Sequence, residues 1–107
     1  MELVTEVYRL ASSFPLEELY GLSSQIKRSA VSIPSNIAED YGRESQKDYL
    51  KFLNIAVSSL FELQTQLEIA KNLSFISEET HISIHENTRE VERMLSSFIR
   101  KIKNTKT

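Results

Sequence analysis

The chain has 107 residues, of which 40% are hydrophobic and 26% charged, and its formal net charge is −2 at pH 7. We expect one domain over 1–107, because the composition is too apolar for a disordered chain and too poor in Gly and Pro for a loop-rich β-fold. The absence of cysteine excludes disulfides and thiolate metal sites, and with no signal peptide and no membrane-length apolar run we expect a cytoplasmic protein with no membrane partner.

Apolar residues recur at helical spacing from the start of the chain, which predicts a first helix over residues 2–13. Its expected apolar stripe consists of Leu3, Val7 and Leu10, with Val4, Tyr8 and Ala11 beside it. Pro15 ends this helix because proline lacks an amide donor and biases Phe14 away from helical angles. Gly21 breaks the chain again before the second helix.

The second helix is expected over residues 23–41, with Gly42 as the residue that follows its C-terminus. Its stripe consists of Ile26, Ala30, Ile33 and Ile37, widened by Val31 and Ala38. Pro34 lies inside this pattern and removes the hydrogen bond to the Ala30 carbonyl. We therefore expect Pro34 to kink the helix or to split it into two shorter helices.

Two longer helices are expected in the second half of the chain, over residues 46–73 and 78–103. The first has a seam formed by Tyr49, Phe52, Leu53, Ala56, Leu60, Leu63, Leu67 and Ala70. The second is capped by Ser77 and has a stripe formed by Ile84, Thr88, Val91, Leu95, Phe98 and Ile102. Four amphipathic helices joined by short breaks predict an all-α fold, an antiparallel up-down four-helix bundle with its second helix kinked at Pro34.

The polar residues around Pro34 are unusual for a bundle helix. The segment 24–39, with its motif residues Ser32, Pro34, Ser35, Asn36 and Glu39, is followed by Tyr41, Gly42 and Arg43. Together with Phe52-Leu53-Asn54-Ile55-Ala56 in the third helix, it resembles the signature of a bacterial four-helix-bundle family. That family includes proteins encoded in intervening sequences of large-subunit ribosomal RNA genes and the accessory variability proteins of diversity-generating retroelements.

The resemblance implies a homo-oligomeric ring, a pentamer. For the retroelement members it also implies binding to a reverse transcriptase and to nucleic acid. A simpler interpretation of the motif needs no ligand, because Ser32, Ser35 and Asn36 could satisfy backbone groups released by the kink, with Glu39 pairing a neighbouring arginine.

Catalytic and metal chemistry find no support in the sequence. His81 and His85 share a helical face and Glu78 precedes His81 by three positions, but the second Glu-x-x-His unit of a di-iron site is missing. No Gly-rich phosphate loop and no nucleophile with an evident base occur. We expect no cofactor, no metal, no catalytic residues and no enzymatic activity.

The net charge conceals an asymmetry, since residues 1–92 carry −7 and residues 93–107 carry +5. Cations at a helix C-terminus complement the helix dipole, but they also suit phosphate. The candidate nucleic-acid contacts are Lys27, Arg28, Arg43, Lys47, Lys51, Arg93, Arg100, Lys101 and Lys103. The alternative for these residues is a solvated surface with ion pairs such as Arg89 with Glu92.

These observations favour a non-enzymatic homo-oligomeric scaffold or adaptor whose first partner is a further copy of itself. Leu50, Val57 and Phe61 are the candidate subunit interface, because the long third helix carries apolar residues on more than one face. The alternative is an RNA- or DNA-binding accessory protein that works with a reverse transcriptase or a structured RNA.

Overall fold

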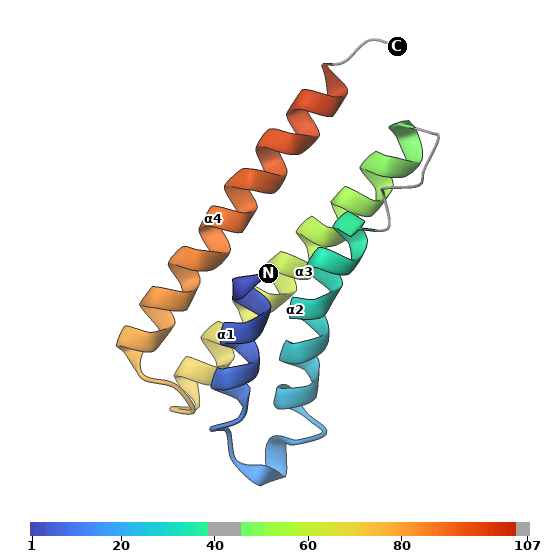
Figure 1. Ribbon diagram of the computed structural model, residues 1–107. Helices are drawn as coiled ribbons and strands as arrows, with labels where there is room; N and C mark the ends of the chain where they lie inside the picture. The colour runs from blue at the N-terminus through green and yellow to red at the C-terminus, as the bar shows by residue number, and fades with distance from the viewer. Residues whose placement is uncertain (39–45, 105–107) are drawn as a thin grey trace.

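The computed structural model describes residues 1–38 and 46–104, and every regular element in these two ranges is helical. The elements are α1 (Glu2–Ala11), the short 3₁₀ helix η1 (Leu16–Glu18), α2 (Leu22–Ala38), α3 (Gln46–Asn72) and α4 (Glu78–Lys103). They form the all-α four-helix bundle that the sequence predicts (Figure 1). None of the described helices is both long enough and apolar enough to cross a membrane.

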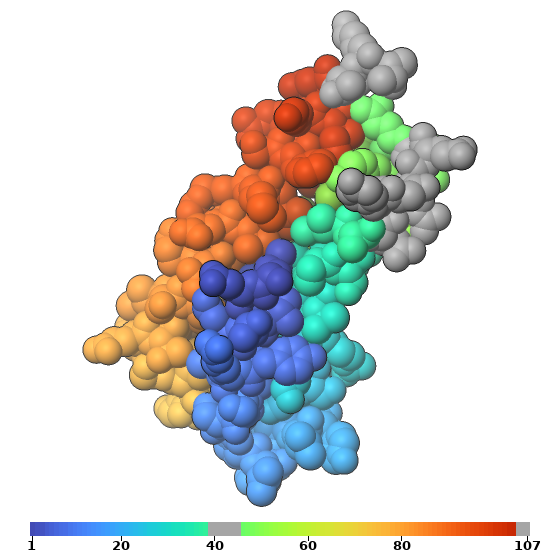
Figure 2. All heavy atoms as spheres, in the orientation of Figure 1, coloured from blue at the N-terminus to red at the C-terminus, as the bar shows by residue number. Residues whose placement is uncertain are grey.

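Consecutive helices lie against each other, and α2 makes its most extensive contact with α3. Gln64 of α3 donates a hydrogen bond to Thr88 of α4, and Gln46, earlier in α3, donates one to Ile102, later in α4. Residues with lower numbers in α3 thus contact residues with higher numbers in α4. The two helices therefore run in opposite directions, as Figure 1 shows. The bundle is elongated, with extents of 50 × 24 × 18 Å, and α1 covers only its lower half between α4 and α2 (Figure 2).

The core follows the predicted stripes most closely in α3. Its buried residues there are Leu53, Ala56, Leu60, Leu63, Leu67 and Ala70, joined by Ile26, Ala30 and Ile33 of α2 and by Ile84 and Leu95 of α4. α1 adds Leu3, Val7 and Ala11, and the breaks add Phe14 and Ile76. The ring centroids of Phe14 and Phe75 are 5.4 Å apart, which ties the α1–η1 turn to the α3–α4 turn.

Four residues placed in the predicted stripes are exposed instead, namely Tyr8, Val31, Ala38 and Phe98. Tyr8 and Val31 are 44% and 38% exposed, because they lie at the edges of α1 and α2 rather than on their inner faces. Phe98 is 42% exposed although its ring packs edge-on against Tyr49, at a centroid distance of 5.6 Å. Asn87 of α4 donates a hydrogen bond to Glu6 of α1, which marks the part of α4 that α1 covers. Phe98 lies several turns beyond Asn87 along α4, so α1 does not cover it.

Pro34 does not split the second helix, because α2 continues through it to Ala38. Of the two expectations, the split into two shorter helices is wrong, and the kink at Pro34 stays a prediction. The Asn36 side chain donates to the Ser32 carbonyl oxygen at 2.7 Å, one turn back along the helix, so a polar side chain supports the backbone at this point. The expected end of the helix at Tyr41 and Gly42 lies outside the described residues.

The turn between α3 and α4 contains a left-handed residue. Ser74 has φ of 62°, its N–H donates to the Lys71 carbonyl at 2.9 Å, and the N–H of Phe75 donates to the Ala70 carbonyl at 2.8 Å. These two bonds are those of a Schellman motif, which closes α3 with a serine where glycine is usual. Ser77 then caps α4 as predicted, since its Oγ accepts from the N–H of Thr80 at 3.1 Å.

Candidate functional site

The motif residues around Pro34 face α3 and form a hydrogen-bonded network with it. Asn36 Nδ2 donates to Ser32 Oγ at 3.0 Å as well as to the Ser32 carbonyl, and Ser32 Oγ lies 2.8 Å from Ser59 Oγ of α3. Because Asn36 donates to Ser32, the Ser32 hydroxyl is free to donate to Ser59. The network joins the two most extensively packed helices and gives these polar side chains a structural role.

The other motif residues contribute differently. Ser35 is exposed and Pro34 is half-buried. Glu39, Tyr41, Gly42 and Arg43 lie outside the described residues, so the expected pairing of Glu39 and the proposed nucleic-acid contact of Arg43 stay predictions.

A polar hollow of about 380 Å³ lies beside this network between α2 and α3. Ser32 and Ser59 line it together with Ser29, and the amide of Gln66 lies at the same hollow. Gln66 Oε1 is buried and accepts no hydrogen bond from the part of the chain that the structure describes. Ser29, Ser59 and Gln66 are not among the predicted site residues, because a serine or glutamine in a helix carries no periodic signal of its own.

Five of the candidate nucleic-acid contacts gather at one end of the bundle. Gln46 at the start of α3 donates to the Ile102 carbonyl near the end of α4, which brings the first turns of α3 beside the last turns of α4. The cations that meet there are all exposed: Lys47, Lys51, Arg100, Lys101 and Lys103. We call this group the basic end. The opposite end of the bundle carries carboxylates of η1 and of the first turn of α4, namely Glu17, Glu18, Glu78 and Glu79.

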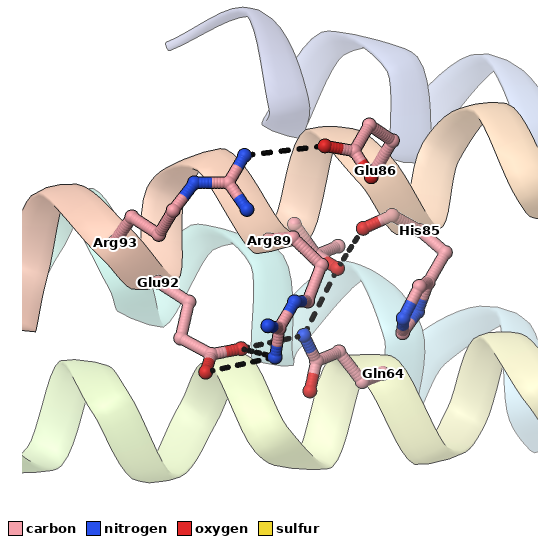
Figure 3. Close-up of polar contacts among 7 residues, drawn as sticks. Gln64, His85, Glu86, Arg89, Glu92 and Arg93 are labelled. Carbon is pink, nitrogen blue, oxygen red and sulfur yellow. Dashed lines mark hydrogen bonds and ion pairs between the residues drawn. The ribbon is translucent and has the colours of Figure 1, made fainter.

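The remaining described candidates lie elsewhere. Arg93 is halfway along α4 and pairs with Glu86, with 3.1 Å between Arg93 Nη2 and Glu86 Oε1 (Figure 3). Lys27 and Arg28 lie on α2 beside η1 and α1, where Lys27 Nζ sits 5.3 Å from the centroid of the Tyr8 ring. The structure therefore divides the predicted nucleic-acid surface into separate groups.

The three candidate interface residues on α3 differ in exposure. Phe61 is 50% exposed and lines a shallow hollow of about 490 Å³ with Ser58 and Thr65. Leu50 is half-buried, and Val57 is half-buried because it packs against the core. Of the three, Phe61 presents the most apolar surface to solvent.

The two histidines of α4 lie close together, with ring centroids 5.7 Å apart. Burial lowers the pKa of His81, and Lys71 and His85 lower it further, while Glu68 and Glu78 act in the opposite direction. Within residues 1–38 and 46–104, no three His, Cys, Asp or Glu side chains come together in a way that could hold a metal ion.

A second polar network joins α3 to α4 in the middle of the bundle (Figure 3). Gln64 Nε2 donates to Thr88 Oγ1 at 3.0 Å and to Glu92 Oε1 at 3.2 Å, and Thr88, which is fully buried, donates to the His85 carbonyl at 2.6 Å. Arg89 pairs with Glu92 at 3.2 Å, which confirms the ion pair expected from their spacing. These bonds fix α3 against α4 in the middle of the bundle.

Comparison with known proteins gives two findings. The family model described as 23S rRNA-intervening sequence protein matches residues 1–97. The chain belongs to this family.

A solved structure described as a protein with unknown function from the S23 ribosomal protein family of Bacteroides thetaiotaomicron is 30% identical, with a TM-score of 0.85. The match covers 92% of this chain and 89% of that chain. No curated protein matches. The resemblance drawn from the segment around Pro34 is thus confirmed at the level of the family.

The extent of the family match bears on the two surfaces described above. Residues 1–97 include the Ser32–Ser59 network and Phe61, whereas Arg100, Lys101 and Lys103 of the basic end lie beyond the matched range. The Ser32–Ser59 network therefore lies within the region that matches the family model, and part of the basic end lies outside that region. Neither finding indicates an enzymatic family.

Proposed function

We propose that this intervening-sequence family member is a non-enzymatic, homo-oligomeric scaffold or adaptor that acts in the cytoplasm. The observation that carries the proposal is the exposure of Phe61, which is 50% exposed in the middle of the longest helix. Burial of a phenylalanine side chain contributes about 1.5–3 kcal/mol, so a repeated contact at this position would stabilise an assembly. The resemblance to intervening-sequence proteins supports a ring of five copies.

Phe61→Glu tests this proposal because it places a charge at the centre of the suggested interface without disturbing the core. The matched control is Ile82→Glu, since Ile82 is 62% exposed on α4. We expect Phe61→Glu to lower the native mass measured by light scattering, and Ile82→Glu to leave it unchanged. A wild-type monomer, or an unchanged mass for Phe61→Glu, would show that this surface is not an interface.

The second candidate function is that of an accessory protein that binds RNA or DNA alongside a polymerase or a structured RNA. The basic end favours it, because phosphate affinity grows with each neutralised contact and the five cations share one end. In an oligomer that aligns these ends, the positive charge would be multiplied.

Matched single charge reversals test the second candidate. Lys103→Glu removes a cation from the basic end, whereas Arg93→Glu removes one that already pairs with Glu86. We expect Lys103→Glu to weaken binding of a fluorescent structured RNA at low salt and to flatten its salt dependence, with a smaller effect of Arg93→Glu. Equal effects of the two reversals would count against the basic end as the phosphate contact.

A further inference from the structure

A hollow between α1, the turn after η1 and α2 combines aromatic and cationic side chains, and neither Phe61 nor a cation of the basic end lines it. Its volume is about 680 Å³, within the range of about 300–1,000 Å³ that is usual for small-ligand sites. Tyr8 of α1 and Tyr20, in the turn after η1, line it together with Lys27 and Arg28 of α2. None of the described residues that line it is acidic, although the chain as a whole is.

Tyr20 is the most exposed large apolar or aromatic side chain among those that the structure describes, at 91%. Leu19 and Val31 line the same hollow and are 48% and 38% exposed, so an apolar surface lies next to the tyrosine ring. An exposed aromatic ring beside apolar side chains offers a face on which a flat ring can stack.

The cations occupy the neighbouring part of the hollow. Lys27 Nζ lies 5.3 Å from the centroid of the Tyr8 ring, and this cation–π contact holds the ammonium group at the wall of the site. Arg28 is exposed and forms no hydrogen bond or ion pair with the described part of the chain. Its guanidinium group can therefore approach a phosphate with its paired N–H donors.

Arg28 and Ser32 also line the polar hollow between α2 and α3, so the two hollows meet along α2. The second hollow offers the hydroxyl groups of Ser32 and Ser59 and, as an acceptor, the carboxylate of Glu62. These groups are hydrogen-bond partners for hydroxyl or amino groups of a ligand that continues past Arg28.

We infer that the α1–η1–α2 hollow binds the nucleobase and phosphate of a nucleotide unit, with the base on Tyr20 and the phosphate between Lys27 and Arg28. The sugar then faces the polar hollow beside Ser32. The same unit can come from a single-stranded nucleic acid or from a free nucleotide. This site goes beyond the proposed scaffold function and does not involve Phe61 or the basic end.

The test measures binding of a short fluorescent oligouridine by anisotropy, with unlabelled oligouridine and uridine monophosphate as competitors. Tyr20→Ala should weaken binding about tenfold, because stacking of a base on an aromatic ring is lost, whereas Tyr20→Phe should retain most of the affinity. Arg28→Ala should weaken binding, and it should reduce the slope of log affinity against log salt concentration by about 1, the value expected for one phosphate contact. The matched control is Leu16→Ala, an 86% exposed η1 residue that does not line the hollow.

Competition by both ligands supports a free-nucleotide site, and competition by the oligomer alone supports a single-stranded nucleic acid. If Lys103→Ala abolishes binding and Tyr20→Ala does not, the basic end is the site and this inference is overturned while the second candidate function stands. If Tyr20→Ala lowers the native mass but leaves binding unchanged, the hollow is a protein interface and the inference is again overturned. Absence of binding to the wild-type protein at low salt would overturn it as well, without bearing on the mass-based test of the scaffold.

Discussion

Ser74 offers a sharp test of the α3–α4 turn, since it is a non-glycine residue at φ of 62°. The left-handed conformation costs an L-residue about 1–2 kcal/mol, and glycine escapes this cost. Glycine also gives the unfolded chain more freedom, which offsets about 0.5–1 kcal/mol of the gain. We therefore expect Ser74→Gly to stabilise the fold by about 0.5–1 kcal/mol.

The assay is urea unfolding followed by circular dichroism, with thermal unfolding as a second probe. For a domain of this size, each 1 kcal/mol shifts Tm by about 4–8 °C, so Ser74→Gly should raise Tm measurably. Ser74→Val is the matched control and should lower stability, because a β-branched residue tolerates positive φ poorly. If Ser74→Gly destabilised the protein while Ser74→Val did not, the turn in solution would not have the left-handed residue and our reasoning would fail.

Three further predictions concern the interior and the α3–α4 contact. Thr88→Val should lower stability by about 1 kcal/mol, and a double-mutant cycle with Gln64→Ala should give a coupling energy above about 0.5 kcal/mol; zero coupling would contradict the Gln64–Thr88 bond. Leu60→Ala should lower the free energy of unfolding by about 2–5 kcal/mol in urea, whereas Leu73→Ala, at a 54% exposed position, should lower it far less. Equal losses would show that Leu60 does not lie in the core. The pKa of His81 is lower in the folded state than in the unfolded state, so the unfolded state binds more protons once the pH falls below about 6.5. The free energy of unfolding should therefore decrease below that pH. At higher pH, His81 should not affect the free energy of unfolding. The midpoint of urea unfolding, measured between pH 5 and 7.5, should depend less on pH in His81→Gln than in the wild type. An unchanged pH dependence would show that His81 does not cause it.

The helix bounds could be predicted where local chemistry marks them. Ser77 followed by two glutamates places the start of α4, and both predicted ends of α4 agree with the structure. The first helix ends at Ala11 rather than at residue 13, and η1 was not predicted, because a 3₁₀ turn of three residues has no periodicity to detect. Pro34 was expected to kink its helix or to split it. The split does not occur, because packing against α3 outweighs the loss of one backbone hydrogen bond.

The core could be predicted better than the candidate sites. A stripe such as Leu60, Leu63 and Leu67 reports burial directly, since its spacing matches the helix period. The Ser32–Ser59 bond depends on how α2 and α3 align, and the basic end depends on how α3 and α4 align, so neither follows from one helix alone. The sequence identifies the candidate cations, but only the packing shows which of them are neighbours.

The separation of charge along the molecule has a consequence for how it meets other molecules. Among the described residues, the basic end and the carboxylates of η1 and α4 lie at opposite ends of a body 50 Å long. The charges of these residues set up an electric dipole along the long axis, on which the field of a polyanion would exert a torque. An encounter with a polyanion would then be end-on, through the narrow cross-section of 24 × 18 Å rather than the flank of the bundle.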